Sequence, residues 1–141
     1  MAEESVGRKA LWAGRIVSAI PVLLMLMSGV FKLVGGAQME KDWTSFGYPL
    51  GTLVPIGATE LACALLFAIP RTSVLGAVLM TGYLGGAVAT HVRAAEYSVS
   101  MALAILGALA WLGLFLRDPR LRALLPLRRD PQVGSGRVAT S

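Results

Sequence analysis

The sequence has few of the residues on which most catalytic and metal sites depend. It contains one cysteine, Cys63, and one histidine, His91, in 141 residues. A single cysteine excludes a disulfide within the chain and any zinc or iron–sulfur site built from several cysteines of this chain. With one histidine, a metal site would need Glu60, Cys63 or a second chain, so no metal site is predicted.

Charge is also scarce. Charged residues make up 15% of the chain and hydrophobic residues 55%, whereas about a quarter of a soluble domain is charged. A chain of this length forms at most one domain, and its apolar content indicates contact with the lipid bilayer. The formal net charge is +5, but the basic residues flank apolar runs or lie near the C-terminus. That placement is typical of a membrane surface, and no nucleic-acid partner is predicted.

Apolar runs predict four transmembrane helices, because a span needs about 20 mostly apolar residues. The fold class expected is all-α, an integral membrane four-helix bundle formed by residues 12–127. Its helices are predicted over residues 12–34, 50–69, 72–92 and 97–117. The polar, glycine-containing segment 34–49 is interpreted as a loop.

The distribution of Lys and Arg predicts the orientation in the membrane. With four spans, ten of the thirteen basic residues fall on the side that carries both termini. The other side holds only Lys32, Lys41 and Arg93. The positive-inside rule therefore predicts cytoplasmic termini. Residues 1–11 are interpreted as an N-terminal cytoplasmic segment, and residues 128–141 as a disordered C-terminal tail.

Glu60 is the most informative residue, since it lies near the middle of the second predicted span. A carboxylate at that depth is costly unless it is paired or protonated. Lys32 lies near the end of the first span on the same side of the membrane as the start of the second, so a Lys32–Glu60 pair is predicted. The helical rise of 1.5 Å per residue places Tyr83 of the third span at the level of Glu60.

Two interpretations of this pair remain open. It is either a structural pin that fixes the register of two helices, or the polar end of a site for a head group, a quinone ring or a proton. In the second case Lys32, Glu60, Tyr83, His91 and Arg93 are the candidate ligand- or quinone-binding residues. His91 taken alone is interpreted as a residue at a helix end facing interfacial water.

The stretch MTGYLGGAVATHVR, residues 80–93, is interpreted first as a packing surface. Gly82 and Gly86 are one turn apart, and small residues at this spacing let another helix approach closely. Cys63 is interpreted as a small packing residue, because an apolar environment disfavours its thiolate.

Several segments together resemble the DoxX-like family of small bacterial membrane proteins. They are SGVFKLVGG, GYP, GATELACALLFAIPRTSVLGA, LMTGYLGGAVATHVR and WLGLFLRDPRLRALLPLR. The resemblance covers about residues 15–129, and it is spread over many positions. It implies a four-helix inner-membrane bundle, and it places the family's Lys, Glu, Tyr and His on Lys32, Glu60, Tyr83 and His91.

The resemblance implies little about activity. Relatives include a membrane subunit of a thiosulfate–quinone oxidoreductase and members linked to oxidative-stress complexes. The first hypothesis is therefore a non-catalytic membrane subunit or accessory of a quinone- or thiol-linked redox system, with a redox subunit as partner. The alternatives are a quinone-linked oxidoreductase in its own right, and a small-solute carrier acting as a homo-oligomer. No motif for flavin, haem or an iron–sulfur cluster is present, so quinone is the one cofactor considered.

Overall fold

The computed structural model describes residues 7–124, which form six α-helices and one short 3₁₀ helix. In chain order they are α1 (Arg8–Val34), α2 (Ala37–Ser45), η1 (Leu50–Thr52), α3 (Leu53–Ala68), α4 (Ser73–Arg93), α5 (Tyr97–Arg117) and α6 (Pro119–Leu124). No strand occurs among these residues, and the predicted all-α class is confirmed.

Four segments are long and apolar enough to cross a membrane: α1, the continuous stretch of η1 and α3, α4, and α5. Their bounds agree closely with the four predicted spans, although α1 begins earlier, at Arg8. Large apolar side chains lie on their outer surfaces, among them Ile16 (63% exposed), Leu23 (65%) and Ile105 (53%). An apolar outer surface on every span is typical of helices that face lipid.

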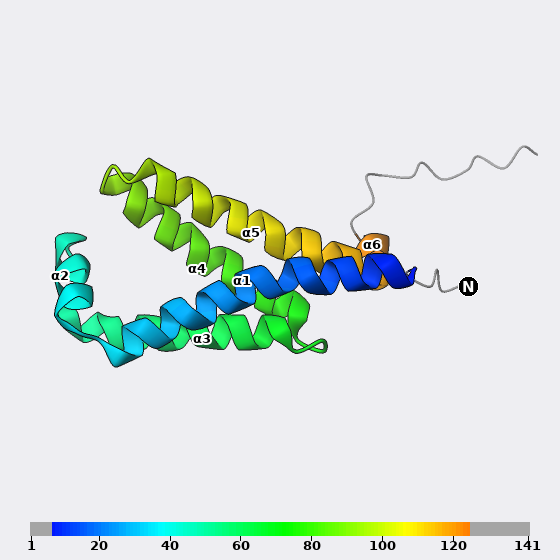
Figure 1. Cartoon of the computed structure of the whole chain (residues 1–141), viewed down its shortest axis with the longest axis horizontal. Helices are drawn as coiled ribbons and strands as arrows, with labels where there is room; N and C mark the ends of the chain where they lie inside the picture. The colour runs from blue at the N-terminus through cyan, green and yellow to red at the C-terminus, as the bar shows by residue number, and fades with distance from the viewer. Residues whose placement is uncertain (1–6, 125–141) are drawn as a thin grey trace, which may run out of the picture.

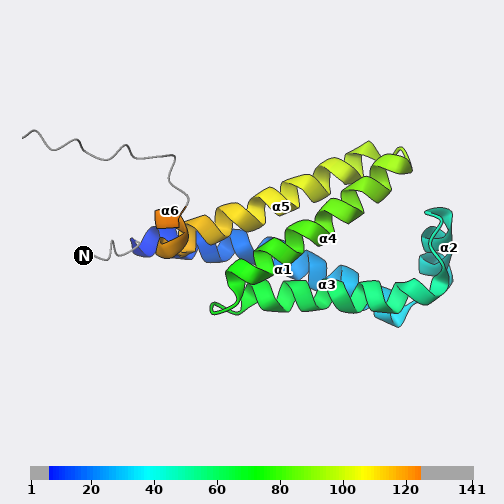
Figure 2. The ribbon, with the colours of Figure 1, turned by 180° about the vertical axis from the view of Figure 1, so that it is seen from behind.

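The four spans form a ring in which α1 and α4 each pack against both α3 and α5. At the α6 end of the bundle α1 lies beside α5, and it then crosses to lie beside α3 (Figures 1 and 2). Towards the other end, α4 and α5 splay away from α1 and α3. Helix α2 lies across this wide end, while α6 and the start of α1 lie at the narrow end (Figure 1).

Close backbone approach holds the narrow end together. A Cβ atom added at Gly113 of α5 would lie 2.8 Å from the backbone nitrogen of Ser18 and 3.1 Å from the carbonyl oxygen of Gly14, both on α1. Arg117, one turn further along α5, donates to the carbonyl oxygen of Phe67 at 2.9 Å. Its guanidinium also lies 4.9 Å from the centre of the Phe67 ring. These contacts tie α5 to α1 and to the C-terminal end of α3.

At the wide end, α1 and α3 approach as closely. A Cβ atom added at Gly57 of α3 would lie 2.8 Å from Cβ of Lys32 and 3.1 Å from the carbonyl oxygen of Gly29. The two helices therefore remain in backbone contact where α4 and α5 have already separated from them.

The prediction of a loop over residues 34–49 was wrong for residues 37–45, which form α2. Gly35 (φ 71°) and Gly36 (φ 126°) turn the chain after α1, in a conformation that glycine adopts without strain. Within α2, Gln38 donates to Asp42 at 2.7 Å one turn later, and Trp43 is buried, with 7% of its surface exposed. A single aromatic anchor thus holds a helix whose sequence is otherwise polar.

The chain ends of the predicted organisation are only partly described. Residues 1–6 of the predicted N-terminal segment and the predicted tail, 128–141, lie outside the described residues. The fourth span ends at the predicted residue: α5 ends at Arg117, and Pro119 begins the short helix α6.

The crossing of α1 and α5 yields a first prediction. Gly113→Ala should lower the stability of the bundle by about 1–3 kcal/mol, because the added methyl group meets backbone atoms that cannot rotate away. Gly85→Ala is the matched control, since nothing lies within 4 Å of a Cβ atom added at Gly85. Thermal unfolding of both variants in detergent measures the effect. Equal midpoints for the two would contradict the proposed close contact.

Candidate functional site

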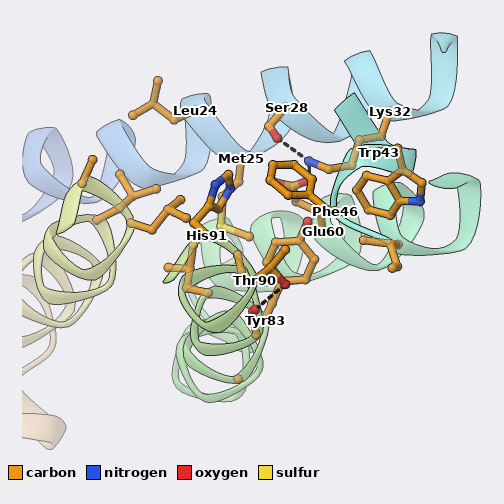
Figure 3. Close-up of a pocket in the computed structure, with 18 of the residues that line it drawn as sticks. Leu24, Met25, Ser28, Lys32, Trp43, Phe46, Glu60, Tyr83, Thr90 and His91 are labelled. Atoms are coloured by element: carbon orange, nitrogen blue, oxygen red, sulfur yellow. Dashed lines mark hydrogen bonds and ion pairs between the residues drawn. The ribbon is translucent and has the colours of Figure 1, made fainter. Parts of the chain in front are cut away.

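An ion pair lies inside the wide end of the bundle. Nζ of Lys32 on α1 is 2.7 Å from Oε2 of Glu60 on α3, and the two side chains are 14% and 5% exposed. The ammonium group also donates to Oγ of Ser28 at 2.6 Å, one turn earlier on α1. Figure 3 shows Lys32 extending from α1 towards both partners. The predicted contact between Lys32 and Glu60 is therefore present.

The sequence around the pair explains why it forms. Gly57 precedes Glu60 by three positions, and Gly29 precedes Lys32 by three, so both glycines lie about one turn from the charges. Their lack of side chains lets α1 and α3 approach until the Lys32 stem rests on Gly57. A buried carboxylate without a partner is strongly unfavourable, and the ammonium group supplies the charge that compensates it.

Tyr83 of α4 lies beside this pair. Its side chain is partly buried and close enough to Glu60 to interact electrostatically with the carboxylate. The prediction that Tyr83 and Glu60 occupy the same depth is thus confirmed. One turn beyond Glu60, Cys63 is buried in the apolar core, with 5% of its surface exposed, which agrees with its interpretation as a packing residue.

A cavity of about 590 Å³ opens beside the ion pair, between the splayed helices. This volume is in the range of small-molecule sites. Its polar groups come mainly from α1, α3 and α4, and its apolar walls from α1, α4 and α5. The four spans contribute to its lining Leu24, Met25, Met27, Ser28, Lys32, Glu60, Gly82, Tyr83, Gly86, Thr90, His91, Ala102, Leu103 and Leu106. Met25 and Leu106 belong to the buried core and form its floor.

Three aromatic residues cover the wide end of the cavity. Trp43 of α2, with Phe46 and Tyr48 of the segment that follows, contributes to the lining. Nε1 of Trp43 donates to Oγ1 of Thr52 at 3.0 Å, and its ring lies 5.1 Å from that of Tyr48, centre to centre. The hydroxyl groups of Tyr48 and Thr90 are 2.7 Å apart, which joins this cover to α4.

His91 and Arg93 contact Phe46 of the aromatic cover and not the Lys32–Glu60 ion pair. His91 lines the cavity, but its Nδ1 is 2.6 Å from Oε2 of Glu96 and its ring meets the Phe46 ring edge-on at 5.0 Å. Arg93 donates to the carbonyl oxygen of Phe46 and does not line the cavity. The structure thus brings Lys32, Glu60, Tyr83 and His91 to one cavity and places Arg93 behind its cover.

A comparison with protein families finds a match to the DoxX-like family over residues 16–113, more than half of the chain. The chain belongs to the DoxX-like family. The match runs from α1 into α5 and includes every candidate residue of the cavity. Together with the four apolar spans, it identifies a multi-pass membrane protein. Comparisons with curated proteins and with solved structures found no match.

In this DoxX-like bundle the glycine-rich face of α4 has another role than the one predicted. Nothing lies within 4 Å of a Cβ atom added at Gly82, Gly85 or Gly86. No helix of residues 7–124 packs closely on these glycines, so the predicted packing surface was wrong for them. Met80 and Leu84 of the same stretch are nonetheless buried in the core. Gly82 and Gly86 line the cavity instead. Towards the wide end α4 splays away from α1 (Figure 2).

The aromatic cover was missed by sequence reasoning. Trp43, Phe46 and Tyr48 lie in the segment interpreted as a loop, and their number within a short polar stretch was the available signal. Among the described residues, no group of three or more His, Cys, Asp or Glu side chains is placed to hold a metal ion.

The ion pair yields a second prediction. Lys32→Met or Glu60→Gln alone should each lower the free energy of unfolding by about 3–5 kcal/mol, because the remaining residue is then a buried charge without an opposite charge beside it. The double variant should recover most of that loss. Thermal unfolding of the three variants in detergent measures this coupling. Additive losses in the double variant would show that the two side chains do not depend on each other.

The cover yields a third prediction. Arg93→Gln should accelerate amide hydrogen exchange in residues 37–49, since the contact that fixes the Phe46 carbonyl is lost. Arg71→Gln, an exposed arginine in the turn between α3 and α4, is the control. Exchange measured by mass spectrometry should change only in the Arg93 variant. Unchanged exchange in both would mean that Arg93 does not hold the cover.

Proposed function

We propose that this DoxX-like chain is a non-catalytic membrane subunit or accessory of a quinone- or thiol-linked redox system. Its cavity holds an amphipathic ligand, such as a quinone, for a partner enzyme. The observation that carries this proposal is the Lys32–Glu60 pair at the edge of a largely apolar cavity of about 590 Å³. A structural pin alone needs no such space beside it.

The bonding of the polar groups favours binding over catalysis. Lys32 is held by Ser28 and Glu60, and His91 by Glu96. Side chains engaged with one another in this way present a fixed surface to a ligand, as pre-organised binding sites do.

The distribution of charge favours an outward-facing site in a bacterial plasma membrane. Lys32, Lys41 and Arg93 lie at the wide end of the bundle, whereas the other basic residues of the described chain lie at or near the narrow end. By the positive-inside rule the narrow end is cytoplasmic. The cavity then faces the outer half of the bilayer, where a periplasmic or membrane-bound partner would meet its ligand.

Complementation tests the proposal and yields the fourth prediction. Membranes of a strain lacking this chain would be complemented with the wild type, with Tyr83→Phe, or with the double variant Lys32→Met and Glu60→Gln. Thiol-driven quinone reduction should fall about tenfold with either variant at normal abundance, because each removes polar groups of the cavity. Tyr97→Phe, an exposed tyrosine outside the cavity, should leave the rate unchanged.

Two outcomes would redirect the proposal. Wild-type rates for all variants at equal abundance would leave the ion pair as a structural pin. Quinone reduction by the purified chain alone would instead make it an oxidoreductase in its own right.

A further inference from the structure

We infer that the cavity takes a neutral, single-chain amphiphile, which enters sideways from the bilayer between α1 and α5. The inference rests on the proposed function and specifies the class of its ligand and the route of entry. It excludes phospholipids and other charged lipids as the preferred occupants.

The charges around the cavity favour a neutral head group. Lys32 and Glu60 carry opposite charges 2.7 Å apart, so their fields largely cancel at the cavity. An anionic head group bound at Lys32 would also lie close to the Glu60 carboxylate, which repels it. A cationic head group bound at Glu60 would lie close to the Lys32 ammonium group in the same way. Either would desolvate a charge that gains no net compensation in an apolar environment.

Hydrogen-bonding capacity nonetheless remains at the polar end. An ammonium group has three donors, and Lys32 uses two of them for Ser28 and Glu60 within residues 7–124. The Tyr83 hydroxyl adds a further polar group to the lining. A carbonyl or hydroxyl oxygen on the ligand is the group that these side chains accommodate without a change in net charge.

The walls below this polar end suit a flexible hydrocarbon chain. The apolar lining includes Leu24, Met25 and Met27 of α1 and Leu103 and Leu106 of α5. Methionine side chains adapt to irregular apolar shapes. The lining thus pairs a small hydrogen-bonding end with a larger apolar part, the complement of a single-chain amphiphile.

The contacts between the helices locate the entrance. At the wide end α1 is joined to α3 by the ion pair, α3 to α4 by Glu60 and Tyr83, and the cover to α4 by Tyr48 and Thr90. The close contacts of α1 with α5, at Gly14 and Gly113, lie at the opposite end. Between Met25 and Leu106 at the floor and the aromatic cover, the side of the cavity between α1 and α5 is therefore the one least closed by contacts between helices.

The residues at this side also face lipid. Leu24 is 44% and Met27 53% exposed on α1, and on α5 the exposed Ala102 lines the cavity. Leu24, Met27 and Ala102 therefore form the rim on this side; the exposed Gly82 and Gly86 of α4 also line the cavity. The rim is apolar and lies within the membrane-spanning part of both helices, so a lipid reaches it without entering water.

The experiment uses the full chain in nanodiscs and gives the fifth prediction. Decylubiquinone, a neutral probe, should quench the fluorescence of Trp43, which lines the cavity; the Trp43→Phe variant supplies the background. Decanol should displace this probe, whereas decyl phosphate and decyltrimethylammonium should each compete about tenfold less well, as unpaired charge in the cavity requires. Ala102→Phe should slow association of the probe about tenfold by narrowing the rim. Ala104→Phe, on the exposed surface outside the cavity, should not.

The outcomes separate the inference from the proposed function. No quenching by decylubiquinone would overturn ligand binding, and with it the proposed function. Quenching with equal competition by decyl phosphate or decyltrimethylammonium would overturn the neutral class alone. Equal association rates for the two phenylalanine variants would overturn the lateral route alone. If Ala102→Phe does not fold, Ala102→Leu makes the same comparison with a smaller side chain.

Discussion

The contact of α1 with α3 at Gly29 and Gly57 is the constraint from which the rest of the wide end follows. It brings the stem of Lys32 onto the backbone of α3 and its ammonium group to Glu60. With a side chain at Gly57, the two helices would move apart and the carboxylate would lose its partner within the membrane. The cost of that isolated charge makes the close approach and the ion pair mutually dependent.

The shape of the bundle follows from where small and large side chains occur. Glycines meet backbone at Gly14 and Gly113, so α1 and α5 touch at the narrow end. At the wide end the aromatic residues Trp43, Phe46 and Tyr48 cover the cavity between the helices. The glycines of α4 then widen this space, because they add no side chains to fill it.

The spans and the ion pair could be predicted from the sequence, since length, hydropathy and helical rise determine depth in a bilayer. The same arithmetic placed Tyr83 beside Glu60. Helix α2 could not be found in this way, because it is held by Trp43 packing on Tyr48 and Thr52 beyond its own end, contacts that no helical pattern within α2 contains. Nor could the open face of α4, since a glycine permits close approach without specifying whether a neighbour is there. The contact of Arg93 depends on a backbone carbonyl, which no residue type reveals.

The splayed arrangement of α4 and α5 also has a consequence for the surrounding lipid. A bundle that is broader at one end occupies more area in one leaflet than in the other. In a flat bilayer this asymmetry strains the acyl chains next to the broader part, and the strain eases when a guest molecule fills the hollow there. The curvature of the membrane and the occupancy of this hollow are therefore coupled. The fraction of molecules with a filled hollow would differ between a leaflet under lateral tension and one under compression.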